Sequence, residues 1–495
     1  MNSNLNRRSG ILIHPTALPG KYGIGEIGPQ AYNFIDNLVA MGQSLWQILP
    51  IGPTDIYNSP YSSISTFAGN PLIISLDLLI EDGLLDSNLL TSYKQSNSNK
   101  ILFSDVVSFK IPILEKVSRE FEFNASSNMK NMFDEFCKDN SYWLDDYSNY
   151  CALKIKNEYT PWMDWESEII KDYQHAHEIK IIQFIFHDQW NRLRQYCKNC
   201  GIQIIGDMPL YVGHDSSDVY ANRELFQLDS YGKMTSQSGC PPCEYQEEGQ
   251  LWGTPLYNWN EHKQNDFQWW NKRFKKLFEM VDIIRLDHFI GYIKYYSIPI
   301  NDKTAHNGDW FEAPGYELFD NLSSTFPNFN VIAEDLGDVT VDVINLRQKF
   351  KFPGMSVLQF EIEDIINNKY SPNNSIVCTG THDNDTLLGW IHSLSDNDEK
   401  AHMLSRLLEL FNCSIEDIHW EIINYAFNTS SNKVIIPIQD ILKKSSASRF
   451  NTPGTLSLDN WSWIMDEDDL TQSIKNKVLN LTMNSSRNIN MLNSK

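Results

Sequence analysis

Short runs of apolar, mostly β-branched residues recur along the chain, and most of them end in polar or charged residues. Uninterrupted apolar runs of about four to eight residues are typical of parallel strands that are buried on both faces. Helical patterns separate most of these runs, as at residues 30–41, 265–280 and 340–350. Eight such runs lie at residues 10–15, 44–50, 202–207, 281–287, 331–335, 355–360, 376–383 and 434–440.

Buried strands that alternate with helices in this way predict an α/β fold, a (β/α)8 TIM barrel. An open doubly wound sheet is the alternative, but no Gly-rich phosphate turn follows the first run. The polar residues stand at the C-terminal ends of the runs, where barrels of this type carry their active sites. We therefore expect residues 1–495 to form a single catalytic barrel.

Uneven spacing of the runs predicts two large insertions. Residues 73–170, between the second and third runs, carry several helical patterns and predict a mainly helical insertion. Residues 211–262 are rich in Gly, Pro, Tyr and Trp and predict a loop insertion. Long loops at this face of a barrel form binding walls or lids, so we expect 211–262 to form a wall for substrate and acceptor.

The charge balance is strongly acidic, with 41 Lys and Arg against 63 Asp and Glu and a net charge of −22. Such a surface repels phosphate backbones and anionic lipids, which argues against nucleic-acid and membrane partners. The most apolar stretch, residues 71–80, contains Asp77 and is shorter than the ~20 residues of a spanning helix. The N-terminus lacks the apolar core of a signal peptide. We expect a cytoplasmic protein, or a stromal one in a plastid.

The chain has eight cysteines, including the pairs Cys197/Cys200 and Cys240/Cys243. The two pairs resemble halves of a zinc site, but the 39 residues between them exceed the about 15–20 of a compact zinc ribbon. A redox-active pair at Cys240 and Cys243 is a second interpretation, which lacks a thioredoxin-like context. Free thiols in a reducing compartment are the third.

Arg285 and Asp287 end the fourth run and share one face of it, because side chains two apart on a strand point the same way. A guanidinium beside a carboxylate lowers the pKa of that carboxylate and keeps it ionised, as a nucleophile requires. A structural ion pair that closes the barrel is the alternative.

Glu334 ends the fifth run on the same face as Ile332, whereas Asp335 points the other way. A carboxylic acid among apolar residues has a raised pKa and can serve as a general acid. Capping of the following helix is the alternative role for this acid.

His382 and Asp383 end the seventh run, and Asp207 ends the third. The first pair also suits a cation site, but an acid that hydrogen-bonds sugar hydroxyls fits better beside two other carboxylates. Four acids on one rim, with an Arg and a His, are too costly to be kept for stability alone. A nucleophile and an acid/base ~5–5.5 Å apart are the arrangement of retaining glycosidases.

Aromatic residues support a sugar site, because the apolar faces of sugars stack on such rings. The chain contains 14 Trp and 22 Tyr, most of which also suit ordinary core packing. The candidates for the rim are Tyr57, Tyr61, Tyr245, Trp252, Tyr257 and Trp259.

In combination, these motifs resemble the 4-α-glucanotransferases of the amylomaltase or disproportionating-enzyme type, glycoside hydrolase family 77. The resemblance covers essentially the whole chain and includes Arg-Leu-Asp-His-Phe at 285–289 and Thr-Gly-Thr-His-Asp-Asn-Asp at 379–385. The other matching segments are 14–20, 59–61, 69–71, 206–209, 249–253, 333–337, 352–355 and 460–463.

The resemblance implies that Asp287 is the nucleophile, Glu334 the acid/base and Asp383 the acid that stabilises the transition state. It implies no cofactor, no metal and no separate C-terminal β-sandwich domain. The implied substrates are maltooligosaccharides and starch- or glycogen-type α-glucans, with glucose or maltose as acceptor. The implied substrate-binding residues are Arg285, His382, Asp207, Tyr61, Ser59, Gln250, Trp252 and Asn451.

The chain departs from the family pattern outside the three acids, which leaves other functions open. An α-glucan hydrolase on the same scaffold is one alternative, and a non-catalytic glucan-binding protein is another. Redox control through Cys240 and Cys243 is a third. The departures are Cys243, Glu244, Thr254, Ile290, Asp459 and Ile464.

Overall fold

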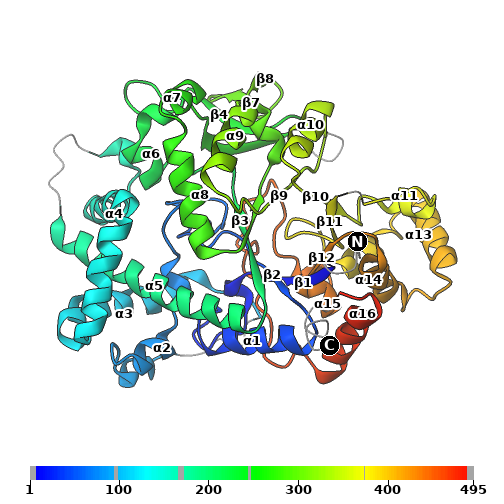
Figure 1. Ribbon diagram of the computed structural model, residues 1–495, viewed down its shortest axis with the longest axis horizontal. Coiled ribbons are helices and arrows are strands. Elements are labelled where there is room, and N and C mark those ends of the chain that lie inside the picture. Colours follow the sequence, from blue (N-terminus) through cyan, green and yellow to red (C-terminus); the bar gives the residue numbers. More distant parts are fainter. Residues whose placement is uncertain (1–6, 94–98, 166–171, 243–246, 373, 488–495) are drawn as a thin grey trace.

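Eight parallel strands form the centre of the molecule (Figure 1). The computed structural model describes residues 7–93, 99–165, 172–242, 247–372 and 374–487. In spatial order the strands are β10 (Gly354–Val357), β11 (Ser375–Cys378), β12 (Lys433–Pro437), β1 (Arg8–Leu12), β2 (Leu45–Gln47), β3 (Gln203–Met208), β6 (Ile283–Leu286) and β9 (Val331–Ala333).

The sheet closes on itself between its first and last strands. The backbone N–H of Ala333, in β9, donates to the carbonyl of Pro353, directly before β10, at 2.8 Å. All eight strands lie within or next to the runs expected from the sequence. The prediction of a (β/α)8 barrel with insertions is confirmed.

Close packing fills the barrel and its wall of helices. Gly10 of β1 lies so near β2 that a Cβ there would approach the carbonyl oxygen of Leu45 to 2.3 Å. Trp46 is fully buried, and its indole N–H donates to the carbonyl of Ile13 at 2.9 Å. These strands are covered on both faces, which explains why their sequences are apolar without alternation.

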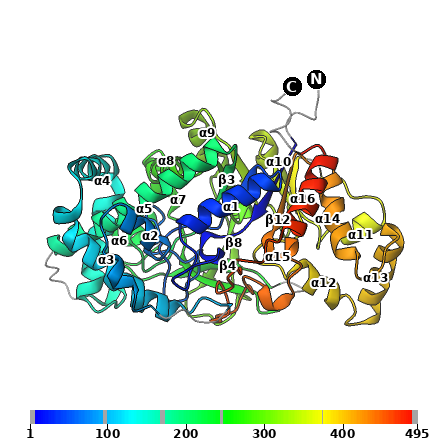
Figure 2. The ribbon, with the colours of Figure 1, turned by 90° about the horizontal axis from the view of Figure 1, so that it is seen from below.

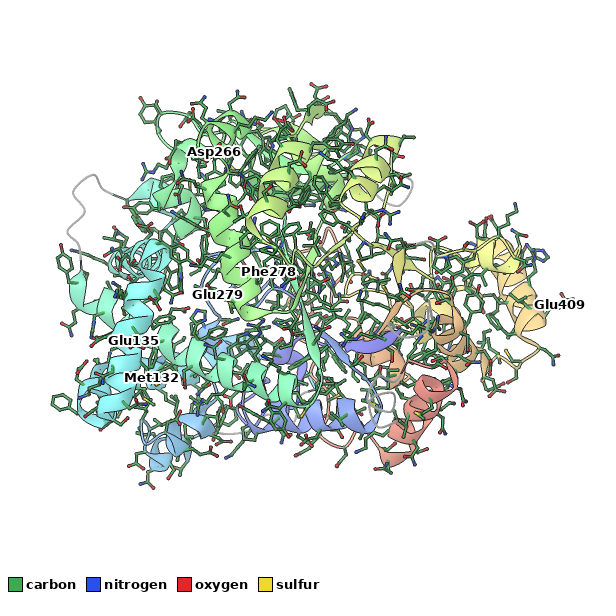
Figure 3. The ribbon with its side chains drawn as sticks, viewed as in Figure 1. Met132, Glu135, Asp266, Phe278, Glu279 and Glu409 are labelled. Atoms are coloured by element: carbon green, nitrogen blue, oxygen red, sulfur yellow. The ribbon has the colours of Figure 1, made fainter. Side chains whose placement is uncertain are left out.

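Helices surround the strands (Figure 2). Outside the two inserted regions, the described helices are α1 (Pro29–Ala40), α5 (Tyr173–Asn199), α8 (Gln268–Met280), α9 (Gly315–Thr325), α10 (Val341–Lys349), α11 (Ile362–Ile366), α12 (Leu387–Ser393), α13 (Asp398–Phe411), α14 (Ile418–Asn428), α15 (Ile438–Ile441) and α16 (Gln472–Asn484). Figure 3 shows their side chains, among them the exposed acids Glu279 on α8 and Glu409 on α13. No helix in the described part of the chain is both long and apolar enough to cross a membrane.

The interval between β2 and β3 contains α2 (Leu76–Glu81), α3 (Phe103–Asn124) and α4 (Ser127–Lys156), which precede α5. Ser126 caps α4 by accepting from the N–H of Met129 at 3.2 Å, as an N-cap serine does. Lys110 of α3 is fully buried and forms an ion pair with Glu26, so a charge pair joins this helical region to the loop after β1.

A second, four-stranded antiparallel sheet lies over the barrel, in the order β5-β4-β7-β8. Its strands are β4 (Ser236–Cys240), β5 (Gln250–Pro255), β7 (Lys294–Pro299) and β8 (Asp309–Glu312). The sequence indicated only loops at 211–262, where the structure has β4, β5, α6 (Ser217–Ala221) and α7 (Trp259–Gln264). Strands β7 and β8 come from the segment after β6, so two barrel loops build one sheet.

Candidate active site

The predicted catalytic residues come from four barrel strands and the loops directly after them. Asp207 lies in β3 and Arg285 in β6. Asp287 directly follows β6, and Glu334 directly follows β9. His382 and Asp383 lie in the loop after β11, so the ends of parallel strands bring these groups to one rim.

Arg285 holds two carboxylates together. Its Nη1 donates to Oδ1 and Oδ2 of Asp207 at 2.8 and 2.7 Å and to Oδ1 of Asp287 at 2.9 Å. The side chains of Arg285 and Asp207 are almost fully buried, whereas that of Asp287 is one-quarter exposed. One cation therefore compensates two acids, and the open carboxylate is the one proposed as nucleophile.

Burial changes the expected acidity of Asp287. It raises the pKa of this carboxyl above its ordinary value, Arg285 lowers it by less, and Asp383 raises it further. The sequence-based prediction of a lowered pKa was wrong, because sequence reveals the neighbouring guanidinium but not the depth of the site. Burial also raises the pKa of Asp207, with Arg285 again opposing.

Glu334 is the acid that keeps its proton. Burial raises its pKa to about 8, while Arg285 lowers it and Asp287 raises it. The backbone N–H of His288 donates to its Oε2 at 2.7 Å. Asp335 points away as expected, since it accepts from the N–H of Met355 at 2.9 Å and pairs with Arg347 at 3.3 Å. At neutral pH Glu334 therefore has the protonation state of a general acid.

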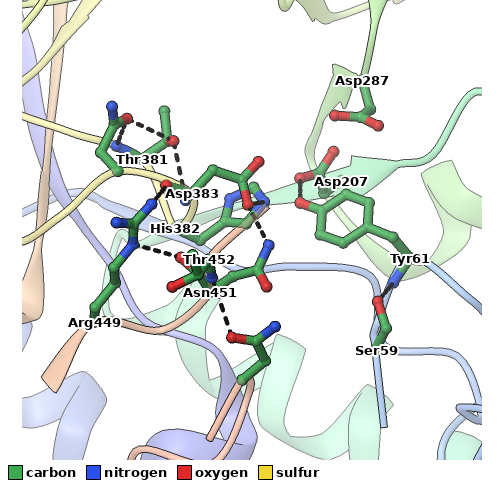
Figure 4. Close-up of polar contacts among 12 residues, drawn as sticks. Ser59, Tyr61, Asp207, Asp287, Thr381, His382, Asp383, Arg449, Asn451 and Thr452 are labelled. Carbon is green, nitrogen blue, oxygen red and sulfur yellow. Dashed lines mark hydrogen bonds and ion pairs between the residues drawn. The ribbon is translucent and has the colours of Figure 1, made fainter. Parts of the chain in front are cut away.

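Asp383 is held from one side and open on the other (Figure 4). Its Oδ1 accepts from Nδ2 of Asn451 at 2.7 Å and lies 3.4 Å from Nε2 of His382. Arg449 donates to its backbone carbonyl at 2.6 Å. The carboxylate is 44% exposed, so it has free lone pairs for the hydroxyl groups of a ligand.

Tyr61 connects the two halves of the site (Figure 4). Its hydroxyl donates to Oδ2 of Asp207 at 2.6 Å, and its ring stacks on His382 at 4.9 Å and 12°. Ser59 supports this loop by accepting from the N–H of Tyr61 at 3.3 Å. Burial lowers the pKa of His382, so its imidazole is neutral in this stack.

Gln250 and Trp252 of β5 reach the site from the second sheet. The indole N–H of Trp252 donates to Oε1 of Gln250 at 2.9 Å. The Trp252 ring meets His288 edge-on at 4.9 Å, next to the N–H that binds Glu334. Trp252 is therefore in direct contact with His288, whose N–H binds Glu334, and Gln250 is linked to it through the indole hydrogen bond.

Other aromatic predictions had different outcomes. Tyr57 is half exposed, as a rim residue should be. Tyr257 is fully buried and packs against Trp259 and Trp270, so it is a core residue and its assignment to the rim was wrong. Tyr245, with the departures Cys243 and Glu244, lies outside the described residues.

The structure does not support a zinc site in the residues that it describes, where no group of three or more His, Cys, Asp or Glu could hold a metal ion. Cys197 is fully buried, and burial raises the pKa of its thiol, which disfavours the thiolate that zinc needs. Redox activity of Cys240 and Cys243 stays a prediction, since Cys243 is not among the described residues.

Sequence reasoning missed His288 and Arg449, which act on the acids through backbone groups. His288 adopts a left-handed conformation with φ +48°, unusual for a non-glycine residue, and so presents its N–H to Glu334. The position of His288 directly after Asp287 was the available signal. Arg449 had none, because a cation that binds a backbone carbonyl leaves no pattern in sequence.

Comparison with known proteins agrees with this geometry. A family model described as 4-alpha-glucanotransferase matches residues 13–470. The 4-alpha-glucanotransferase of Streptococcus pneumoniae is 39% identical, over 96% of each chain. The chloroplastic/amyloplastic 4-alpha-glucanotransferase of Solanum tuberosum is 38% identical over 93% of this chain and 82% of its own. The structure of the amylomaltase of Streptococcus agalactiae in complex with acarbose superimposes with a TM-score of 0.92 at 32% identity. The match spans 97% of this chain and 100% of the amylomaltase chain.

Proposed function

The chain belongs to the 4-alpha-glucanotransferase family, and we propose that Asp287, Glu334 and Asp383 carry out its reaction. The enzyme transfers a segment of an α-1,4-glucan to the 4-hydroxyl of an acceptor glucose or glucan, with retention of configuration. The observation that carries the assignment is the contrast between two acids. Arg285 donates a hydrogen bond of 2.9 Å to Asp287 and favours its ionised form. Burial instead raises the pKa of Glu334 to about 8 and favours its protonated form.

In the first step, Asp287 attacks the anomeric carbon of the donor glucan and Glu334 protonates the departing glycosidic oxygen. The attack forms a covalent glucosyl-enzyme with inverted configuration. Arg285 stays bound to Asp207 and positions the attacking carboxylate throughout. Asp383 presents its exposed carboxylate to sugar hydroxyls, where hydrogen bonds strengthen as positive charge develops on the ring.

In the second step, the 4-hydroxyl of an acceptor sugar replaces the leaving glucan. Glu334, now ionised, takes the proton of that hydroxyl as the new bond to the anomeric carbon forms and the bond to Asp287 breaks. A second inversion restores the original configuration. The N–H of His288 stabilises Glu334 in its ionised form between the two steps.

Transfer exceeds hydrolysis only if binding of the acceptor sugar stabilises the second transition state more than water can. Trp252, at the edge of His288, is the candidate wall of this acceptor site. We infer that glucose or maltose serves as acceptor and that maltooligosaccharides and starch- or glycogen-type glucans are donors. The amylomaltase relative in complex with acarbose supports this class of ligand. Hydrolysis on the same scaffold is the second candidate, since Cys243 and Glu244 depart from the family pattern.

Further inferences about partners and compartment follow from the charge of the chain and from its proposed substrates. The net charge of −22 supports a protein without nucleic-acid or membrane partners. We place the enzyme in the cytoplasm, or in a plastid stroma, because its proposed substrates are intracellular storage glucans and their breakdown products. The chemistry of the three acids requires no cofactor.

The product profile from maltotriose tests this function. Transfer produces glucose and longer oligosaccharides at a constant number of reducing ends, whereas hydrolysis increases that number. Asp287→Asn should abolish both products, and substantial residual turnover would refute its role. Asp282→Asn is a matched control, because Asp282 lies at the opposite end of β6, where it accepts from the N–H of Ile204 at 2.8 Å. A glucan-binding protein without catalysis would leave maltotriose unchanged.

A further inference from the structure

Trp461 touches both rings that organise the active site. Its indole lies 5.8 Å from the Tyr61 ring and 6.0 Å from the His382 ring, at 40° and 35°. The side chain is almost completely buried. We propose that Trp461 is a positioning residue for glucan transfer, which fixes Tyr61 and His382 in the places from which they hold Asp207 and Asp383. This inference rests on the proposed function of these acids.

The two contacts reach opposite halves of the polar network. Trp461 contacts the Tyr61 ring, and the Tyr61 hydroxyl donates to Oδ2 of Asp207, which Arg285 also binds. Trp461 also contacts the His382 ring, whose Nε2 lies 3.4 Å from Oδ1 of Asp383. A shift of the indole would therefore disturb both the carboxylates shared by Arg285 and the acid proposed to bind sugar hydroxyls.

The backbone of Trp461 is unusual in a way that indicates a constraint. Its φ is +64°, in the left-handed region that bulky residues rarely adopt. Such strain persists only where the surroundings impose it, and it is concentrated at functional sites. The N–H of Trp461 donates to the carbonyl of Phe450 at 2.7 Å, and the Phe450 ring meets the indole edge-on at 5.7 Å. This conformation turns the indole toward Tyr61 and His382.

Tyr61 and His382 need such support because hollows border both of them. One pocket is lined by Tyr61 and Asp207, and another is lined by His382 and Arg449. Side chains beside open space can turn unless a neighbour blocks them, and close packing is what fixes rotamers elsewhere in a protein. Trp461 packs against both rings and supplies that restraint.

Residues 449–463, which we name the strap, anchor Trp461 from both ends. Asn460 closes the strap by accepting from the N–H of Thr452 at 3.1 Å and donating to the carbonyl of Thr455 at 3.0 Å. After Trp461, the carbonyl of Ser462 accepts from the N–H of Ile101 at 2.6 Å. The strap therefore contains both Asn451, which binds Asp383, and Trp461. The hydrogen bond from Ile101 attaches it to the segment before α3.

Trp463 provides a matched control on the same strap. It is equally buried, at 3% exposure. Among the described residues, no ring contact joins Trp463 to Tyr61 or His382, although it lies two positions from Trp461. A general requirement for an intact strap would affect both tryptophans, whereas positioning of the two site rings requires only Trp461.

The test compares Trp461→Phe, Trp461→Ala and Trp463→Phe by steady-state kinetics on maltotriose. We expect Trp461→Ala to lower kcat by about 10- to 100-fold, the effect of misplacing catalytic groups by about 1 Å, with KM changed less than about threefold. Trp461→Phe should recover part of kcat, and Trp463→Phe should keep the parent kcat. The inference is overturned if Trp461→Ala keeps the parent kcat, or if Trp463→Phe loses as much as Trp461→Phe at an equal melting temperature.

A double substitution identifies the route of the effect. In a Tyr61→Ala background, Trp461→Ala should cost clearly less in kcat than it does in the parent, because one of its two partners is already gone. An equal cost in both backgrounds would contradict action through Tyr61. The parent enzyme separates this outcome from the proposed function: if the parent does not transfer glucose units, the function fails, and if both parent and Trp461→Ala transfer equally, only this inference fails.

Discussion

The backbone N–H of His288 donates a hydrogen bond of 2.7 Å to Oε2 of Glu334, although 46 positions separate the two residues. The left-handed turn at His288 directs this N–H across from the end of β6 to the end of β9. The hydrogen bond favours the ionised carboxylate, whereas burial favours the protonated acid and outweighs it. The pKa of Glu334 therefore lies close to neutral pH, where this residue can both donate and accept a proton in one catalytic cycle.

The pH dependence of kcat/KM should show this balance. The first step requires protonated Glu334, so activity should fall as the pH rises through about 8. It should also fall at acidic pH, as Asp287 becomes protonated at a pH above the ordinary range for Asp. Glu334→Gln should lower kcat/KM by about 10²- to 10⁴-fold and remove the alkaline limb. Asp335→Asn, on the opposite face, should keep that limb. An unchanged alkaline limb in Glu334→Gln would show that another group causes it.

Glu334 should also make the stability of the protein depend on pH. Its pKa rises from an ordinary 4.5 to about 8 in the folded state, so the folded state binds the proton more tightly over that interval. The free energy of unfolding should therefore fall as the pH rises from about 4.5 to about 8. Glu334→Gln removes this penalty, and its melting temperature should exceed that of the parent at pH 8 but not at pH 4. A difference that is the same at both pH values would contradict this linkage.

The barrel could be predicted from the sequence because its strands are covered on both faces. A strand such as Ile283–Leu286 must be apolar at every position except where Arg285 enters the site, and that pattern is local. The second sheet could not be predicted. Its strand Ser236–Cys240 is short and polar, and one of its two partner strands, β7, comes from a different barrel loop, so no run or alternation marks it.

The convergence of the four acids on one rim was also predictable, but their acidity was not. Alternation along a strand places Arg285 beside Asp287 in any extended conformation. Whether that guanidinium or burial decides the pKa depends on the depth of the site and on Asp383, which comes from a distant strand. Likewise, the sequence predicted both Tyr257 and Tyr61 at the rim, and only their packing shows that Tyr257, against Trp270, is core and that Tyr61, bonded to Asp207, belongs to the site.

Removal of Arg285 should shift both limbs of the pH profile to higher pH, because this cation lowers the pKa of Asp287 and that of Glu334. Arg285→Ala leaves Asp207 and Asp287 close together without their shared cation, so the pKa of Asp287 should rise further. The acid limb of kcat/KM should then move to higher pH. The free energy of unfolding should fall by about 3–5 kcal/mol at neutral pH.

This loss should become smaller at low pH, where the two carboxyls are protonated. Arg194→Met is the control, because Arg194 pairs with Asp282 at 3.2 Å at the opposite end of β6 and is partly exposed. It should move neither limb. An acid limb that stays in place in Arg285→Ala would show that the cation does not set the ionisation of the nucleophile.

The buried pair of Lys110 and Glu26 should matter for stability and not for catalysis. Lys110 also donates to the carbonyl of Ile74 at 2.7 Å, so it joins α3 to two loops of the barrel. Lys110→Met alone leaves the Glu26 carboxylate buried without a partner, which should cost about 3–5 kcal/mol of unfolding free energy. Adding Glu26→Gln should restore most of it. The measurement is the urea midpoint at constant slope. A double variant no more stable than Lys110→Met would contradict the charge argument.

Trp252 should decide the partition between acceptor sugar and water. Its ring meets His288 edge-on at 4.9 Å and 89°, and its indole N–H is fixed by Gln250 at 2.9 Å. An aromatic wall stabilises a bound sugar by about 1 kcal/mol and gives water nothing comparable, so Trp252→Ala should raise the ratio of hydrolysis to transfer about fivefold. The ratio follows from new reducing ends against longer oligosaccharides formed from maltotriose.

Two further variants make the Trp252 experiment decisive. Gln250→Ala removes the acceptor of the indole hydrogen bond but leaves the ring in place, and it should shift the ratio less than Trp252→Ala does. Trp310→Ala removes a half-exposed ring from β8 of the same sheet and should not change it. If Trp252→Ala lowered hydrolysis and transfer in equal proportion, the ring would contribute to the donor or to Glu334 through His288, and the discrimination against water would have to come from another part of the acceptor wall.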